Sequence, residues 1–329
     1  MKVNKKIYLE FLEVSKQTSV PIKKVLDIFW HLSKNGSIEN NELLRKIGVS
    51  KNALNQVKKA LSLYLMPTTK ETKLTTEAIE KMVSFYPTDY MVEENLLAVI
   101  DGDIYKEAVE LLAGHKDRRC KPRRKYDQFT ATIETTARRV SLLNFFGDIR
   151  EKRILFLGDD DFTSIPTASL KIAQNITVVD IDTRILNEIA NISEKHDLDI
   201  ERLKYDVREP IPNILKNQFD VVFTDPPYTP KGIKLFVSRA IEMLDKKNKT
   251  ARLYVCYGNS DRAKERFLLI QEILTNSGLV IRWVFDKFNR YYEAESIGST
   301  SSLFVTEITP KTKPLIIQGD YNEPIYTNN

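Results

Sequence analysis

Two short stretches of the sequence carry residues that could bind and activate a cationic substrate. In the first, an apolar run at 154–157 ends in a glycine and three consecutive aspartates, the segment Gly158, Asp159, Asp160 and Asp161. Nucleotide-binding loops at this place usually carry further glycines, which let the backbone approach a phosphate. Three carboxylates would instead repel a phosphate or an amino-acid carboxylate and would attract amines. The loop therefore predicts a positively charged ligand.

The second stretch is DPPYT, residues 225–229. Two consecutive prolines stiffen the turn and lack backbone N–H groups, so nearby carbonyls remain available as acceptors. The Asp225 carboxylate and the Pro226 carbonyl could then accept hydrogens from an attacking amine, which the ring of Tyr228 could cover. This motif after a strand is typical of enzymes in which a nitrogen nucleophile meets a sulfonium cofactor. A rigid turn without chemistry is the alternative.

Further aspartates stand where other strands are expected to end. Asp180 follows Gly158 by about 20 residues, the interval at which an acid binds ribose hydroxyls. A carboxylate has two acceptor oxygens and can hold both hydroxyls of an adenosine ribose. Asp206 is placed to accept from the exocyclic amine of adenine, and we assign Asp182 and Pro226 to the same cofactor region. Such residues can instead cap helices, but two at these spacings favour ligand contact.

The chemistry that these groups predict is a displacement by an amine nitrogen. A protonated amine has no lone pair, so a neighbouring carboxylate must accept its proton. Closely spaced aspartates raise one another's pKa and strengthen such a base. We expect Asp159 to be the base or to orient the nucleophile, with Asp225 and Tyr228 in support. Asp160 and Asp161 would hold the cationic tail, unless one of them caps the next helix.

Two flanking stretches supply further candidates for substrate binding. Tyr126 and Gln128 precede the first expected strand and could lie at the mouth of the pocket. Glu293 and Glu295 lie between the last two expected strands, where they could hold distal ammonium groups or simply belong to a solvated loop. No metal site is expected, because the two cysteines are far apart and stand in no ligand spacing.

The pattern from residue 153 onward predicts how these residues are positioned. Apolar runs alternate with helical patterns, which indicates an α/β fold with a mostly parallel, doubly wound sheet. The last two runs form a hairpin, as in Rossmann-like sheets of the class I methyltransferase type. Ligands of such sheets bind at the carboxyl ends of the strands. The expected strands are 153–157, 176–180, 200–206, 219–225, 251–258, 279–289 and 301–309, with helices over 183–195, 232–244 and 262–278.

The part before residue 153 divides into two further segments. Apolar residues at spacings of three and four predict a helical N-terminal domain over 1–114. The basic run at its end opens a segment, 115–152, that we interpret as a linker and a cover for the pocket. The Rossmann-like catalytic domain then extends over 153–329.

The N-terminal domain resembles a winged helix. A helix, a turn around Gly48 and a second helix would be followed by a small wing over 66–80. A DNA-binding role would place Lys51, Asn52 and Gln56 on the recognition helix. We favour a dimerisation or lid module instead, because a fold does not fix its function.

The overall composition limits the class of protein. With 329 residues, 42% hydrophobic and 29% charged, the chain is typical of soluble globular proteins. Without a membrane-spanning run or a signal-peptide core, we expect a cytoplasmic protein. The net charge of +5 is too small to predict nucleic-acid binding, which could involve only the N-terminal domain. Few glycines and many lysines and glutamates are compatible with a thermophilic source, and a homodimer through the N-terminal helices is expected.

Together these motifs resemble a known family. The pair GDDD and DPPYT, with YDQ at 126–128 and YYEAES at 291–296, is similar to the branched-chain polyamine synthases, N(4)-bis(aminopropyl)spermidine synthases. The resemblance implies aminopropyl transfer from decarboxylated S-adenosylmethionine to the internal secondary amine of spermidine. Methylthioadenosine and tertiary, then quaternary, amines would result, with no permanently bound cofactor. It also implies Asp159 beside the acceptor nitrogen.

Two other functions remain open at this stage. The main alternative is an S-adenosylmethionine-dependent N-methyltransferase acting on amino groups of DNA or RNA, favoured by DPPYT and the winged-helix pattern. Its weakness is the triple aspartate where the methionine carboxylate would bind. A transcription regulator with a ligand-sensing domain is the third hypothesis, and it gives the strand-end aspartates no catalytic role.

Overall fold

The computed structural model describes residues 4–47, 49–88, 90–92, 100–258, 264–292, 300–317, 319 and 321–327. Contacts divide the chain into two compact units, Met1–Ile100 with Asn144–Gly147, and Asp101–Leu143 with Asp148–Asn329. The boundary predicted from the sequence lies at 114. In the structure, α7 (Asp103–Ala113) packs against α9 (Ser164–Ser169) and belongs to the second unit.

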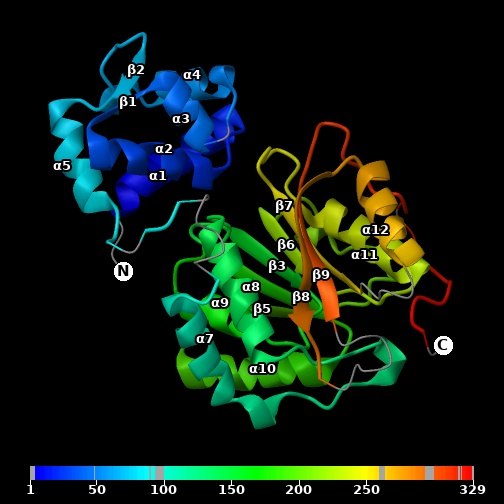
Figure 1. Cartoon of the computed structure of the whole chain (residues 1–329). Helices are drawn as coiled ribbons and strands as arrows, with labels where there is room; N and C mark the ends of the chain where they lie inside the picture. Colours follow the sequence, from blue (N-terminus) through cyan, green and yellow to red (C-terminus); the bar gives the residue numbers. More distant parts are fainter. Residues whose placement is uncertain are drawn as a thin grey trace. The chain divides into compact units, whose positions relative to one another are not determined.

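The first unit is helical with one small sheet (Figure 1). Its elements are α1 (Lys5–Thr18), α2 (Ile22–Asn35), β1 (Ser37–Glu39), α3 (Asn40–Ile47), α4 (Lys51–Ala60), β2 (Glu71–Lys73) and α5 (Thr76–Phe85). β1 and β2 pair antiparallel. Phe11 packs at 4.6 Å from the Phe29 ring and 5.5 Å from the Phe85 ring, in the core of this unit.

The expected pair of helices corresponds to α3 and α4. Ser50 caps α4, since its side chain accepts a hydrogen bond from the Ala53 N–H at 3.2 Å. The region 66–80, where a wing was expected, contains β2 and the first turn of α5. The winged-helix assignment and the DNA-facing role of α4 stay predictions.

The second unit is built around a seven-stranded sheet with the order β5-β4-β3-β6-β7-β9-β8. Neighbouring strands from β5 to β7 are parallel, whereas β9 is antiparallel to both β7 and β8. The predicted doubly wound sheet with one antiparallel edge is therefore confirmed. Besides α7 and α9, the helices and strands of the second unit are α8 (Ile133–Phe145), β3 (Arg153–Leu157), β4 (Asn175–Asp180), α10 (Thr183–His196), β5 (Glu201–Lys204), β6 (Val221–Thr224), α11 (Pro230–Met243), β7 (Arg252–Gly258), α12 (Lys264–Asn276), β8 (Val280–Arg290) and β9 (Thr300–Glu307).

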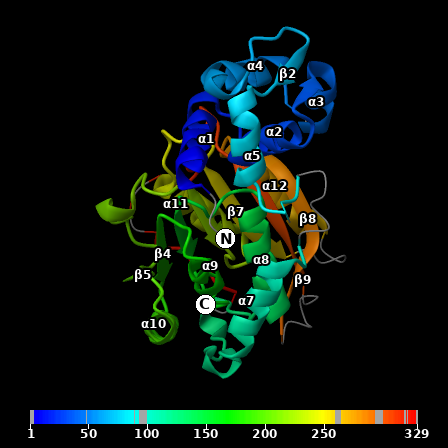
Figure 2. The ribbon, with the colours of Figure 1, turned by 90° about the vertical axis from the view of Figure 1, so that its left-hand side faces the viewer.

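Helices cover both faces of this sheet. In Figure 1 the sheet lies between α8, α9 and α10 on one side and α11 and α12 on the other, and Figure 2 shows α10 next to β4 and β5. Residues 154–157 of β3 are all buried, as expected for a strand covered on both faces. Leu155 and Leu157 pack in the cluster that contains Ile233 and Ile270 of α11 and α12.

The order of the strands decides where a ligand can bind. From β3 the chain runs outward through β4 and β5, and then crosses back to β6 on the other side of β3. A crevice forms at such a switch point, outside the carboxyl ends of the two central strands. The loops that follow β3 and β6 are GDDD and DPPYT, so the topology brings the two motifs together.

A buried arginine links the sheet to the segment before β3. Arg252 of β7 is bound to Asp148 at 2.9 Å and to Glu307 of β9 at 2.9 Å, and all three side chains are largely buried. The Tyr254 hydroxyl donates to the same Asp148 carboxylate at 2.5 Å. Removing one member of such a group leaves buried charges without compensation.

We therefore predict that Arg252→Gln lowers the free energy of unfolding by about 3–5 kcal/mol, measured by urea unfolding followed by circular dichroism. The matched control is Arg282→Gln, because Arg282 pairs with the same Glu307 but half of its side chain is exposed. That variant should lose no more than about 1 kcal/mol. Equal losses in the two variants would contradict the prediction.

Candidate active site

The loop after β3 begins with a glycine that the backbone requires. Gly158 has φ +78°, in the left-handed region that favours glycine. The turn directs Asp159 back to the start of α9, where its carboxylate accepts from the N–H groups of Thr163 at 2.7 Å and Ser164 at 3.0 Å. Burial raises the pKa of Asp159 to about 7, against these hydrogen bonds. Asp159, the base predicted from the sequence, is thus the aspartate that caps the helix.

Asp161 is also held within the protein. Its side chain is almost fully buried. One oxygen accepts from the Ala131 N–H at 2.5 Å, and the other accepts from Arg139 Nη1 at 2.8 Å. The sequence assigned Asp161 to the substrate tail, but in this structure both of its oxygens have protein partners.

Asp160 differs from its two neighbours. It is half-buried, and no residue in the described part of the chain forms a hydrogen bond or an ion pair with its carboxylate. Burial, followed by the charges of Asp161 and Asp180, raises its pKa well above the usual range. A cationic ligand would stabilise the ionised form of this group. Among the described residues, Asp160 is therefore the aspartate of the loop whose carboxylate has no partner.

Asp225 lies at the end of β6 and is surrounded by hydroxyl groups. The Tyr228 hydroxyl donates to Oδ1 at 3.0 Å, and the Tyr291 hydroxyl donates to Oδ2 at 2.6 Å. Burial raises the pKa of Asp225, and the nearby Arg139 opposes that rise. The sequence predicted the Asp225 and Tyr228 pair but did not single out Tyr291, although it begins the quoted YYEAES stretch.

The DPPYT turn has the predicted open acceptor. Pro226 is buried, and none of the described residues donates to its carbonyl oxygen. The ring of Tyr228 packs on the backbone of Gly258 at the end of β7, where a Cβ would come within 2.7 Å of that ring. Only glycine leaves room there, so the position of Tyr228 depends on Gly258.

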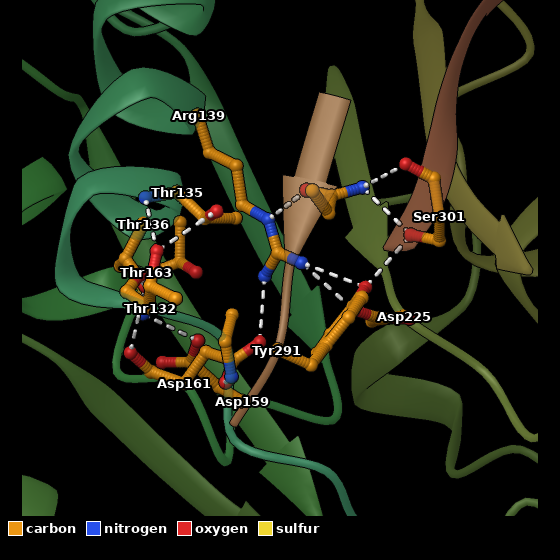
Figure 3. Close-up of polar contacts among 12 residues, drawn as sticks. Thr132, Thr135, Thr136, Arg139, Asp159, Asp161, Thr163, Asp225, Tyr291 and Ser301 are labelled. Atoms are coloured by element: carbon orange, nitrogen blue, oxygen red, sulfur yellow. Dashed lines mark hydrogen bonds and ion pairs between the residues drawn. The ribbon is translucent and has the colours of Figure 1, made fainter. Parts of the chain in front are cut away.

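Arg139 of α8 connects the two motifs. Its guanidinium donates from Nη1 to Asp161 and from Nη2 to Asp225, both at 2.8 Å, and lies between them in Figure 3. Nε donates to Asn289 of β8 at 2.8 Å. The sequence did not indicate this residue, because nothing in it distinguishes the buried Arg139 from the partly exposed Arg138 that precedes it.

Each of the three aspartates of the predicted nucleoside site has a partner within the protein: backbone N–H groups for Asp180 and an arginine for Asp182 and Asp206. Asp180 accepts from the N–H groups of Asp182 at 2.7 Å and Asp159 at 3.2 Å, and burial raises its pKa to about 6. Asp182 caps α10 and is paired with Arg184 at 2.6 Å, so its predicted role as a ligand contact competes with a structural one. Asp206 is half-buried and paired with Arg208 at 2.6 Å.

The two residues predicted at the mouth of the pocket, Tyr126 and Gln128, have different surroundings, and Tyr126 lies beside a residue of the C-terminal segment. The Tyr126 ring lies 5.7 Å from the Tyr326 ring, whereas Gln128 accepts from the Arg123 N–H and closes its own turn. Tyr326 was missed from the sequence, since nothing in a polar C-terminal stretch connects it to the site. Its ring lies 6.0 Å from the Arg208 guanidinium, beside the predicted adenine contact. Glu293 and Glu295 lie outside the described residues.

Within the described part of the chain, no cluster of three or more His, Cys, Asp or Glu side chains could hold a metal ion. None of the helices described is long and apolar enough to cross a membrane.

Comparison with known proteins assigns a family to most of the second unit. Residues 104–320 match the family model described as the branched-chain polyamine synthase A C-terminal domain. That match covers well over half of the chain and includes both motifs of the site.

Curated relatives agree with this match. Two N(4)-bis(aminopropyl)spermidine synthases are similar: that of Thermococcus kodakarensis is 31% identical over 240 residues, 72% of this chain and 67% of the relative. That of Methanocaldococcus jannaschii is 33% identical over 198 residues, 58% and 56%. An uncharacterised protein of M. jannaschii is 45% identical over 201 residues, 61% and 49%. The match to this chain thus spans about half the length of each of the two M. jannaschii relatives.

Among solved structures, the branched-chain polyamine synthase of Thermus thermophilus, in complex with N4-aminopropylspermidine and 5′-methylthioadenosine, aligns over 98% of both chains. The TM-score is 0.61 and the sequence identity 22%. At that identity the likeness supports the fold. The family model and the T. kodakarensis relative carry the assignment: this chain belongs to the branched-chain polyamine synthase family.

Proposed function

We propose that this chain transfers aminopropyl groups from decarboxylated S-adenosylmethionine to the internal secondary amine of spermidine, as the names of its relatives suggest. One observation carries the proposal. Asp160 has a carboxylate without a partner among the described residues, in the loop after β3 at the switch point of the sheet. Asp225 and the Pro226 carbonyl, to which none of the described residues donates, follow the adjacent strand β6.

The charges of the site favour this pair of substrates. Asp161 and Asp225 share one buried guanidinium, so the protein compensates only part of their charge. Asp160 and Asp180 have no ion-pair partner among the described residues. Decarboxylated S-adenosylmethionine carries a sulfonium and an ammonium group, and spermidine is a polycation. Both would supply the missing positive charge, whereas the carboxylate of intact S-adenosylmethionine would meet Asp160 as a like charge.

The groups present can perform the transfer in one displacement. The secondary amine of spermidine arrives protonated, with two N–H groups and no lone pair. We propose that it gives one proton to Asp160, whose pKa is raised, and donates the remaining N–H toward Asp225 and the Pro226 carbonyl, with Tyr228 beside it. The lone pair then attacks the methylene carbon bonded to sulfur, the C–S bond breaks, its electron pair leaves with methylthioadenosine, and the product is a tertiary ammonium.

The nucleoside would lie over the other end of the switch point. Asp180 is proposed to bind the ribose hydroxyls, because each of its oxygens has a further lone pair after accepting one backbone N–H. Asp206 and Tyr326 are proposed to line the adenine. A homodimer remains a prediction.

A product assay tests the activity. The protein is incubated with spermidine and either decarboxylated or intact S-adenosylmethionine, and the products are analysed by mass spectrometry. We expect methylthioadenosine and an aminopropylated, branched spermidine from the decarboxylated donor alone. Methyl transfer from the intact donor to an oligonucleotide, with no branched polyamine, would instead establish the N-methyltransferase.

Substitutions of adjacent aspartates test which one accepts the proton. Asp160→Asn should lower kcat by at least about 100-fold without lowering the thermal midpoint, because this carboxylate has no partner among the described residues. Asp159→Asn is the matched control and should retain more activity, because the asparagine oxygen can still accept from the Thr163 N–H. The reverse ranking in steady-state assays would return the role to Asp159.

The pKa of Asp180, raised to about 6, predicts the pH dependence of nucleoside binding. Only the ionised carboxylate accepts from both ribose hydroxyls, so its protonation weakens binding. The affinity for methylthioadenosine should therefore fall as the pH drops below 6, by up to about tenfold per pH unit, measured by titration calorimetry from pH 5 to 8. Asp180→Asn should bind more weakly and without this dependence. Constant wild-type affinity across that range would contradict the assignment.

A further inference from the structure

A site proposed to bind cations contains a buried cation of its own. The Arg139 side chain is almost fully buried, and each of its three nitrogens donates to a side chain. Nε donates to Asn289 and Nη1 to Asp161, and Nη2 donates to Asp225 at 2.8 Å and to Tyr291 at 3.3 Å. Placing a positive charge here reduces the attraction for a cationic substrate, so it needs a compensating role.

The geometry indicates what that role is. Asp161 and Asp225 belong to loops after different strands, and the planar guanidinium is the group that joins them directly. A guanidinium presents its donors in a fixed plane, whereas the ammonium of lysine is a point charge on a flexible stem. The guanidinium of Arg139 therefore sets the distance between the aspartate loop, which carries Asp160, and the DPPYT turn.

We propose that Arg139 is the positioning residue of this site: it fixes Asp225 at a set distance from the aspartate loop and keeps it ionised, as an acceptor for the substrate amine. The role in catalysis rests on the proposed aminopropyl transfer. Four of the five N–H groups of the Arg139 guanidinium donate to protein side chains, and the side chain is almost fully buried, so we infer that it acts through Asp161 and Asp225 and not by contact with the substrate.

The surroundings of Asp225 explain why a cation is needed there. The groups that face it are Arg139 of α8, Asp160 and Asp161 of the loop after β3, Tyr228 of its own turn, Cys256 of β7 and Tyr291 after β8. Arg139 is the one cation among them. Burial and Asp161 raise the pKa of Asp225, and Arg139 is the main group that lowers it. Without the guanidinium, Asp225 would take up a proton at higher pH.

This arrangement also gives the three aspartates Asp160, Asp161 and Asp225 different roles. Asp161 and Asp225 both bind Arg139, whereas Asp160 has no ion-pair partner in the part of the chain that the structure describes. The guanidinium thus leaves one acid of the loop to take a proton while the acid in DPPYT stays an acceptor.

Two substitutions separate the charge of Arg139 from its shape. Arg139→Lys keeps the positive charge but loses the planar pair of donors that joins Asp161 to Asp225. We therefore expect kcat to fall at least about tenfold, while the acidic limb of the plot of kcat/KM against pH stays in place. Arg139→Gln removes the charge, so that limb should move up by about 1–3 pH units. Unaltered kcat in Arg139→Lys, or an unmoved limb in Arg139→Gln, would overturn the proposal.

The matched control is Arg252→Lys. Arg252 is likewise buried between two carboxylates of the same unit, Asp148 and Glu307, but belongs to no motif of the site. This variant should lower the thermal midpoint and leave KM and the pH profile unchanged. If it alters the profile as Arg139→Gln does, the effect reflects loss of stability and the positioning role is wrong.

A measurement independent of turnover keeps this proposal separate from the proposed function. In protein labelled with ¹³C-aspartate, the Asp225 carboxyl is assigned with Asp225→Asn and titrated by NMR. Its pKa should rise by at least about one unit in Arg139→Gln and stay near the wild-type value in Arg139→Lys. An unchanged pKa in Arg139→Gln would overturn the proposal, whereas this shift in a protein without aminopropyl transfer would contradict only the proposed function.

Discussion

The structure of the site depends on one buried guanidinium shared by two carboxylates. Asp161 and Asp225 would repel each other inside the protein, and burying either without a partner would cost several kcal/mol. Arg139 makes their proximity possible, and through Asn289 and Tyr291 it also connects them to the antiparallel edge of the sheet. Asp160 and Asp180 have no ion-pair partner among the described residues, and we propose that cationic ligands compensate their charge.

The topology of the sheet explains why so many acids meet. Parallel strands end at the same edge, and the reversal of strand order between β3 and β6 opens a crevice there. Each loop leaves its strand with a different local requirement, so adjacent residues take different roles. Asp159 supplies acceptors for the start of α9, Asp161 binds Arg139, and Asp160 has no partner among the described residues. The three identical residues are therefore not equivalent.

The same turn can serve two chemistries, and the loop before it distinguishes them. A DPPY-type turn holds a nitrogen nucleophile through a carboxylate and a carbonyl, whatever electrophile stands opposite. Glycines after β3 would leave room for a donor that carries a carboxylate. We propose that aspartates at that place exclude it by charge repulsion and favour a donor whose tail is an amine. The proposed choice of donor thus rests on the electrostatics of one loop.

The sequence by itself determined the sheet, its antiparallel edge and the two motifs, because hydrophobic periodicity and strand-end residues are local patterns, and it predicts a positively charged ligand. The tertiary structure decided which aspartate does what, since that depends on whether a backbone N–H or a guanidinium lies within hydrogen-bond distance. Arg139 and Tyr326 could not be found from local patterns, because their contacts join positions that are 150 residues apart for Arg139 and Asn289 and 200 residues apart for Tyr326 and Tyr126. Whether a charged side chain is buried depends on its partners in the folded chain, so it cannot be predicted from the neighbouring residues in the sequence.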